Sequence, residues 1–156
     1  MMDRGCSLLI ILLSFLGLLA GVGTFVYFLF GANNINASIF ALISGVIALA
    51  ALHIHLLYYI RRLYDWYSPK ELKGIVIFGL IIFILSAAVF GAYIALAIEK
   101  EQTYVLEGWS YYPAATCAAH TLLWSFVLFI SALVFRKRML QYPPLLEDDK
   151  TNRRYS

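Results

Sequence analysis

Four long apolar runs constrain this chain more than any other feature of its sequence. They extend from Ser7 to Phe30, Asn36 to Ile60, Lys73 to Ile98 and Tyr111 to Phe135. Each run provides the roughly 20 residues that an α-helix needs to cross a hydrocarbon layer about 30 Å thick. None shows the alternating apolar and polar pattern of a membrane β-strand. The sequence therefore predicts an all-α membrane protein built as a bundle of four transmembrane helices.

The composition agrees with this prediction and leaves little room for anything outside the membrane. Of the 156 residues, 62% are apolar and 13% are charged, whereas a soluble domain has roughly 45–50% apolar and about 25% charged residues. We expect one transmembrane domain over residues 1–138 and a short polar cytosolic tail over residues 139–156. Any function must then lie in the spans and their short loops.

The positions of the basic residues predict the orientation of the bundle. Eleven of the twelve Lys and Arg residues lie in the N-terminus, the loop between the second and third runs, and the tail, and the exception is Lys100. Because basic residues accumulate on the cytosolic side, both termini should be cytosolic. The formal net charge of +3 follows from this bias, so we expect the lipid bilayer and no nucleic acid as a partner.

The second and third helices are separated by a clear start signal. Ser68 can serve as N-cap, Pro69 suits the first helical position, and Glu71 stands three residues after the cap. This is the pattern of a capping box with proline in the first turn. It predicts that the third helix begins at this point.

The three histidines, His53, His55 and His120, all fall inside apolar runs. Ionisable groups are costly in hydrocarbon and often mark a pathway or a ligand site, and imidazole is the commonest metal ligand. Positions two apart point about 200° apart on a helix, so His53 and His55 should lie on different faces. His55 shares its face with Tyr58 and Tyr59.

The last span presents Cys117, His120 and Trp124 on one face. His, Cys and Tyr are all known axial ligands of heme iron. His55 lies near the predicted cytosolic end of its helix and His120 in the lumenal half of its own, so the two could form stations along a path. An alternative stays open, because a membrane histidine can instead hydrogen-bond a neighbouring helix for about 0.6–2 kcal/mol.

Enzymatic chemistry finds no support in the spans. They contain no pair of carboxylates for acid–base catalysis, no Ser/His/Asp constellation, and no His-x-x-x-His step for zinc. We therefore predict that the protein is not an enzyme.

Several short segments, in this order along the chain, are similar to motifs of one known family: His55-Leu56-Leu57-Tyr58, Asp65-Trp66, Leu72-Lys73-Gly74, Leu96-Ala97-Ile98, Gln102-Thr103, Ser110-Tyr111-Tyr112, Trp124-Ser125-Phe126 and Phe135-Arg136-Lys137-Arg138. From His55 to about Arg138 the chain resembles the HRG (heme-responsive gene) family of small four-span heme transporters. The resemblance covers roughly half of the chain. One departure is Glu101, which stands in the lumenal loop where the family often has His.

This resemblance implies movement of heme from the exterior or an endolysosomal lumen to the cytosol without ATP hydrolysis. Heme would be the transported substrate, with His55 and His120 as axial ligands of its iron. Tyr58 or Tyr59 would stand near His55. The heme propionates would be held at the exit by the basic residues after the last span, Arg136, Lys137 and Arg138.

The tail carries a sorting pattern. Tyr142-Pro143-Pro144-Leu145 fits the endocytic Tyr-x-x-hydrophobic form, and a clathrin adaptor would bind it through Tyr142 and Leu145. We expect a multi-pass protein of the endosome or lysosome membrane, the plasma membrane, or both.

A second reading of the chain is a non-transporting tetraspan, such as a MARVEL-like junction or trafficking protein. Its histidines would be packing residues. Its small-residue steps would bind partner helices or a second copy of the chain: Gly17 and Gly21 in the first run, and Ala87, Gly91 and Ala95 in the third.

Overall fold

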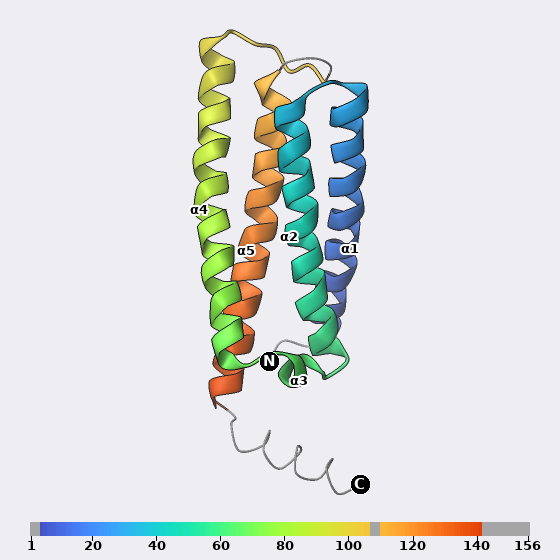
Figure 1. Cartoon of the computed structure of the whole chain (residues 1–156), viewed down its shortest axis with the longest axis vertical. Helices are drawn as coiled ribbons and strands as arrows, with labels where there is room; N and C mark the ends of the chain where they lie inside the picture. Colours follow the sequence, from blue (N-terminus) through green and yellow to red (C-terminus); the bar gives the residue numbers. More distant parts are fainter. Residues whose placement is uncertain (1–3, 107–109, 142–156) are drawn as a thin grey trace, which may run out of the picture.

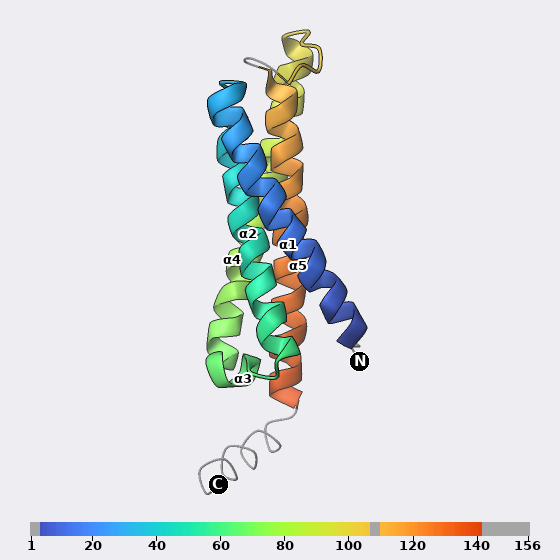
Figure 2. The same cartoon turned by 90° about the vertical axis from the view of Figure 1, so that its right-hand side faces the viewer.

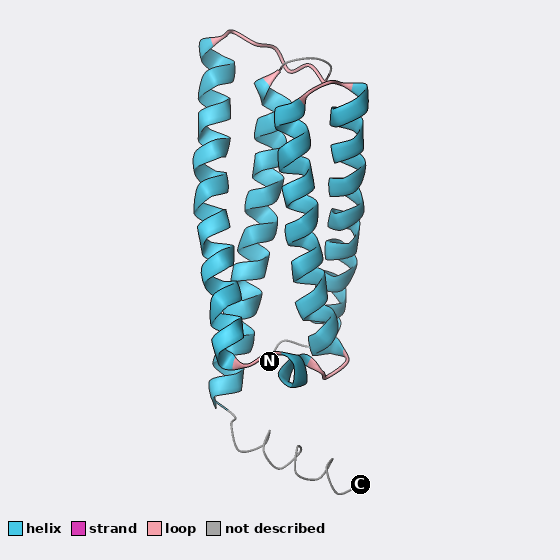
Figure 3. Cartoon of the chain, in the orientation of Figure 1, coloured by secondary structure: helices cyan, strands magenta, loops and turns pink. Residues whose placement is uncertain are grey.

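The computed structural model describes residues 4–106 and 110–141. This part of the chain is helical throughout, with short connecting loops (Figure 3). Its elements are α1 (Arg4–Val26), a π-helical turn (Tyr27–Gly31), α2 (Ile35–Tyr59), a short α3 (Leu63–Trp66), α4 (Pro69–Glu99) and α5 (Tyr111–Gln141). Four helices (α1 with its π-helical turn, α2, α4 and α5) are long and apolar enough to cross a membrane. The prediction of an all-α four-helix membrane protein is therefore confirmed.

The capping box before α4 forms as predicted. The Ser68 hydroxyl accepts a hydrogen bond from the Glu71 backbone N–H at 3.3 Å, and the Glu71 carboxylate accepts one from the Ser68 N–H at 2.6 Å. Pro69 occupies the first turn. These bonds satisfy N–H groups that a helix start otherwise leaves without partners, and they fix where the third span begins.

The last helix is longer than its apolar run. It continues past Phe135 to Gln141, beyond the boundary predicted at residue 138. Met139 lies in the core with 8% of its surface exposed, so the first residues assigned to the tail belong to the bundle. The sorting pattern at Tyr142 and Leu145 lies outside the described residues.

The helices are arranged around a central pair. α2 and α5 pack against each other, α1 packs mainly on α2, and α4 packs on α5 (Figures 1 and 2). About half of the most apolar window of α2 and of α5 is buried, against 17% for α1 and 11% for α4. The outer helices therefore present most of their surface to lipid. We call the end that carries α3 the cytosolic end and the opposite end the lumenal end, following the charge-based prediction.

The central pair runs in parallel and in register. The Asn34 side-chain amide donates to the Ser110 carbonyl at 2.8 Å near the lumenal end, and the ring Nε2 of His55 lies 2.8 Å from Ser131 Oγ near the cytosolic end. Both bonds join residues 76 positions apart. The chain thus forms two helical hairpins, α1–α2 and α4–α5, which pack against each other through α2 and α5.

The outer helices bury small residues at intervals of seven. α1 buries Ser7, Ser14 and Gly21, and α4 buries Gly79 and Ser86. Small side chains let helix backbones approach closely in membranes, where packing replaces the hydrophobic effect as the driving force. A repeat of seven keeps such a seam against a neighbouring helix.

Two glycines of α1 show how close this approach is. A Cβ added to Gly21 would lie 2.6 Å from the Cα of Gly45 on α2. A Cβ added to Gly17 would clash with the Trp124 ring of α5. The GxxxG step noted in the sequence is therefore used inside the chain, where it seats α1 on both central helices.

The second small-residue stripe is not used in this way. Ala87, Gly91 and Ala95 are exposed, and no neighbouring atom lies within 4 Å of a Cβ built on Gly91. α4 instead turns Gly79 and Ser86 inward. Spacing alone could not decide which of two small-residue faces meets the bundle, since both repeat at helical intervals.

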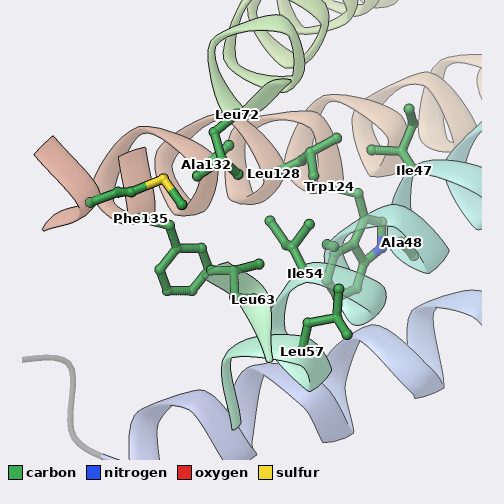
Figure 4. Packing of buried hydrophobic residues seen from close by; sticks show 12 residues of the cluster. Ile47, Ala48, Ile54, Leu57, Leu63, Leu72, Trp124, Leu128, Ala132 and Phe135 are labelled. Carbon is green, nitrogen blue, oxygen red and sulfur yellow. The ribbon is translucent and has the colours of Figure 1, made fainter. Parts of the chain in front are cut away.

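The main hydrophobic core lies in the cytosolic half, between α2 and α5. Figure 4 shows its side chains, which α3 and α4 supplement with Leu63 and Leu72. Leu63 is 1% exposed and Leu72 is fully buried. The short helix α3 therefore closes the cytosolic end of the bundle beneath the central pair.

Candidate functional site

The first group of predicted site residues surrounds His55 at the cytosolic end. Its imidazole is fully buried, and Nε2 shares a hydrogen bond of 2.8 Å with Ser131 Oγ of α5. The Phe135 ring packs edge-on against the imidazole with centroids 5.3 Å apart. The second ring nitrogen, Nδ1, has no hydrogen-bond partner among the described residues. His55 therefore forms a hydrogen bond between α2 and α5 through Nε2, and its Nδ1 has no partner among the described residues.

Tyr58 extends this group toward the cytosolic rim. Its ring stacks on Phe135 with centroids 4.6 Å apart and an interplanar angle of 25°. Its hydroxyl accepts a hydrogen bond of 2.6 Å from Arg138 Nη1, and the guanidinium carbon lies 5.7 Å from its ring centroid. We call the five residues His55, Ser131, Phe135, Tyr58 and Arg138 the cytosolic cluster.

The remaining residues predicted at this end lie apart from the cytosolic cluster. Tyr59 is 43% exposed on another face of α2, and Lys137 is exposed. Arg136 is partly buried, and its Nε has no hydrogen-bond partner among the described residues. Of the three basic residues expected to hold propionates, Arg138 is thus already engaged by Tyr58.

His120 lies in a different environment, at the edge of a groove in the lumenal half. This groove has a volume of about 230 Å³ and is bounded by α1, α2 and α5, which contribute Gly21, Ser44 and Cys117 among others. The imidazole is exposed, in contrast to that of His55. The two residues predicted to share its helix face lie in different places. Cys117 lines the groove together with His120, whereas Trp124 packs against Gly17 of α1.

A second cavity continues this groove toward the lumenal end. It has a volume of about 440 Å³ and shares Thr24, Thr116 and Cys117 with the first. Tyr27 of the π-helical turn and Tyr104 of the last loop line its outer part. We call the two cavities together the lumenal groove. It leads from the loop before α5 to His120.

One polar group inside the lumenal groove lacks a partner. The Ser44 side chain is 1% exposed, and its hydroxyl has no hydrogen-bond partner among the described residues. A buried hydroxyl without a partner costs free energy. Ser44 is therefore a polar residue of the groove lining whose hydroxyl the described residues leave without a partner.

The two histidines lie at different depths, as predicted. His55 is level with Ser131, and eleven residues separate Ser131 from His120 on α5. At about 1.5 Å per residue the levels differ by roughly 16 Å. One iron atom cannot bind both imidazoles, so any metal would meet them in turn. Within residues 4–106 and 110–141, no three His, Cys, Asp or Glu side chains are grouped to hold a metal ion on their own.

His53 lies on a different face of α2 from His55, which confirms the helical prediction. It is exposed, whereas His55 is fully buried. Its ring faces Trp66 and Tyr67 edge-on, with centroids 6.1 Å and 6.2 Å away.

Sequence-based prediction did not identify Ser131, whose hydroxyl forms the hydrogen bond that holds His55 against α5. Serine in an apolar run gives a weak signal, because most such residues bond their own helix. The pairs Asn34–Ser110 and His55–Ser131 share a separation of 76 residues. This regularity could not have served as a sequence signal, because it becomes visible only once the two helices are known to be parallel.

Comparison with protein-family models, with curated proteins and with solved structures finds no match to this chain. The function must therefore be argued from the two sites and from the sequence motifs.

Proposed function

We propose that the protein transports heme across a membrane, receiving it in the lumenal groove and passing it toward the cytosolic end. One observation carries the proposal: an exposed imidazole, His120, stands at the edge of an apolar groove whose lining extends to the loop before α5 at the lumenal end. An apolar cavity with few convergent polar groups is the usual form of a small-molecule site. The sequence motifs around His55 and Phe135 suggest heme as the occupant.

The lumenal groove has the chemistry that heme would need. A ring nitrogen of His120 can donate its lone pair to the iron, as a proximal histidine does in heme proteins. Apolar walls and the rings of Tyr27 and Tyr104 suit the porphyrin faces. Ser44 offers a hydroxyl without a partner. Cys117 lines the same wall, and its sulfur would be a second donor atom for the iron.

Passage onward requires the cytosolic cluster to open. His55 can bind iron through Nε2 only after its hydrogen bond to Ser131 breaks, because in either tautomer that bond occupies the one N–H or the one lone pair of this nitrogen. The stacked rings of Tyr58 and Phe135 must separate as well. The described conformation, with His120 exposed at the lumenal groove and the cytosolic cluster closed, corresponds in this scheme to the state that receives substrate.

The basic residues after the last span would then hold the substrate at the exit. Arg138 would exchange the Tyr58 hydroxyl for a propionate, which forms a stronger, charge-assisted hydrogen bond. Arg136 and Lys137 would supply further positive charge. Entry from the exterior or an endolysosomal lumen, and release to the cytosol, are what the family resemblance implies for a bundle in the predicted orientation.

The proposal is tested by hemin binding and by growth. Purified protein in lipid nanodiscs should shift the Soret band of hemin, and His120→Ala should weaken that binding and impair growth of a heme-auxotrophic host at limiting heme. Val22→Ala, an exposed position on the lipid-facing side of α1, serves as the matched control. Full growth rescue and an unchanged Soret shift in a His55→Ala/His120→Ala double variant at wild-type abundance would refute the proposal.

The second candidate is a non-transporting tetraspan that binds partner helices in the membrane. It is favoured by the outward face of Ala87, Gly91 and Ala95, which no other helix of the described chain covers. In that case Gly91→Leu should abolish association while His120→Ala has no effect. Crosslinking in native membranes separates the two functions, because a transporter should tolerate the change at Gly91 and require His120.

A further inference from the structure

A third groove lies on the side of the bundle away from α1, between α2 and α4. It has a volume of about 500 Å³, and Leu128 of α5 contributes to its lining. α2 and α4 both contact α5 but have little contact with each other, which leaves a slot between them. Its walls are apolar side chains, with Val46 and Leu49 on one side and Ile75 and Phe78 on the other.

His53 is the accessible imidazole of this slot. It projects from α2 between the apolar walls and the aromatic residues at the end of α3, with ring contacts to Trp66 and Tyr67. Among the described residues it has no hydrogen bond, unlike His55, whose Nε2 is held by Ser131. The motif in the sequence favours His55, but the folded chain leaves His53 as the cytosolic-half histidine that a ligand can reach without any helix movement.

The position of His53 separates it from His120. Because α2 and α5 run in register with an offset of 76 residues, His53 is level with Phe129, nine residues beyond His120. At about 1.5 Å per residue the two imidazoles differ in depth by roughly 13 Å. They also face different outer helices, His120 toward α1 and His53 toward α4. The two grooves therefore cannot hold the same molecule.

Charge in the connection between α2 and α4, from which Tyr67 lines the slot, defines its ligand further. The chain leaves α2 and enters α4 through a segment with four exposed basic side chains and two carboxylates, and one of these carboxylates, that of Glu71, is committed to the capping box. The basic residues are Arg61, Arg62, Lys70 and Lys73. A ligand with a flat apolar body and an anionic edge would place its body in the slot and its edge among these groups.

We propose that the α2–α4 slot is a second metalloporphyrin site, with His53 as axial ligand and the basic segment holding the propionates. The imidazole nitrogen would replace water on the iron, without any change in oxidation state. This inference rests on the proposed function and adds to it a cytosolic-half site that the substrate reaches while the cytosolic cluster stays closed. The site would let the porphyrin leave sideways, along the lipid-facing surface of α2 and α4.

The test is the number of hemin molecules that bind the full chain in nanodiscs, corrected for hemin taken up by empty nanodiscs. We expect two binding events in the wild type, and one in His53→Ala and in His120→Ala. Loss of both events in the double variant completes the expected pattern. His53→Met should restore the second event with an altered Soret and charge-transfer spectrum, because thioether sulfur replaces nitrogen on the iron. A purely structural role of His53 would produce no such spectral change.

The outcomes distinguish this inference from the function on which it rests. A single event that depends on His120 and is unchanged in His53→Ala would overturn the second site and leave the proposed function intact, with lipid filling the slot. An absence of any Soret shift in the wild type would overturn both. Changing Lys70 and Lys73 to Gln should weaken only the event that depends on His53, and equal weakening of both events would remove the basic segment from the site.

Discussion

The two halves of the bundle differ in how far they expose a histidine side chain. At the cytosolic end His55 is fully buried and bonded to Ser131. In the lumenal half His120 is exposed at the edge of a groove. The difference arises because His55 lies on the seam of the central pair, whereas His120 faces α1, which packs mainly on α2. A histidine in a span is thus enclosed or left accessible according to which helix it faces.

The largest expected effect comes from disturbing α1, the helix that His120 faces. Gly21→Ala places a Cβ 2.6 Å from the Gly45 Cα, so α1 must move away from α2. Overpacking of this kind costs about 1–3 kcal/mol, which a thermal unfolding curve in detergent should show. Gly23→Ala is the matched control, because nothing lies within 4 Å of its Cβ. Equal stability of the two variants would mean that α1 is not seated at this contact.

The second prediction tests the structural role of His55. His55→Ala removes a buried ring and an interhelical hydrogen bond, so we expect a loss of about 2 kcal/mol. His53→Ala, measured without hemin, should cost much less, because that ring is exposed. A double-mutant cycle with Ser131→Ala should give a coupling energy of about 0.6–1.7 kcal/mol. A coupling energy of zero would show that the bond does not hold the cytosolic end closed.

A smaller effect is expected at the rim of the cytosolic cluster. Tyr58→Phe keeps the ring that stacks on Phe135 and removes the hydroxyl that Arg138 bonds at 2.6 Å. The loss should be about 1 kcal/mol. If this bond also restrains opening, heme-dependent growth at limiting heme should rise in the variant. Arg138→Gln should then match Tyr58→Phe in stability, and clearly different values would show that Arg138 has another partner.

The smallest effect on stability is expected where the effect on function should be greatest. His120→Ala should change the unfolding free energy by no more than about 0.5 kcal/mol, since the imidazole is exposed. It should nevertheless weaken hemin binding in the same preparation. A strongly destabilised His120→Ala variant would contradict the contrast between the two ends, and hemin binding would then have to be compared at equal folded fractions.

Part of this architecture could be predicted residue by residue. The four spans, the start of α4 at Ser68 and the separation of His53 from His55 onto different faces all follow from local rules of length, capping and helical period. The ends of the spans were less accurate, because α5 continues as a helix beyond its apolar run to Gln141. Hydropathy reports where a helix is apolar, not where its hydrogen bonds stop.

The candidate sites were predicted less completely. His120 was assigned a place in the lumenal half, but the groove beside it depends on where α1 and α5 diverge. The bond between His55 and Ser131 depends on the register of two helices that are 76 residues apart in sequence. Spacing within one helix carries no information about either, since both are properties of a pair of helices.

The sequence by itself determined that this chain crosses a membrane four times and that its histidines stand at two depths, because an apolar layer of fixed thickness imposes length and polarity on each span separately. Only the tertiary structure decided that α2 and α5 form the centre, that Gly17 and Gly21 face inward while Gly91 faces outward, and that His55 is enclosed while His53 and His120 are accessible. These choices depend on close packing between helices, where a difference of one methyl group determines which faces can meet.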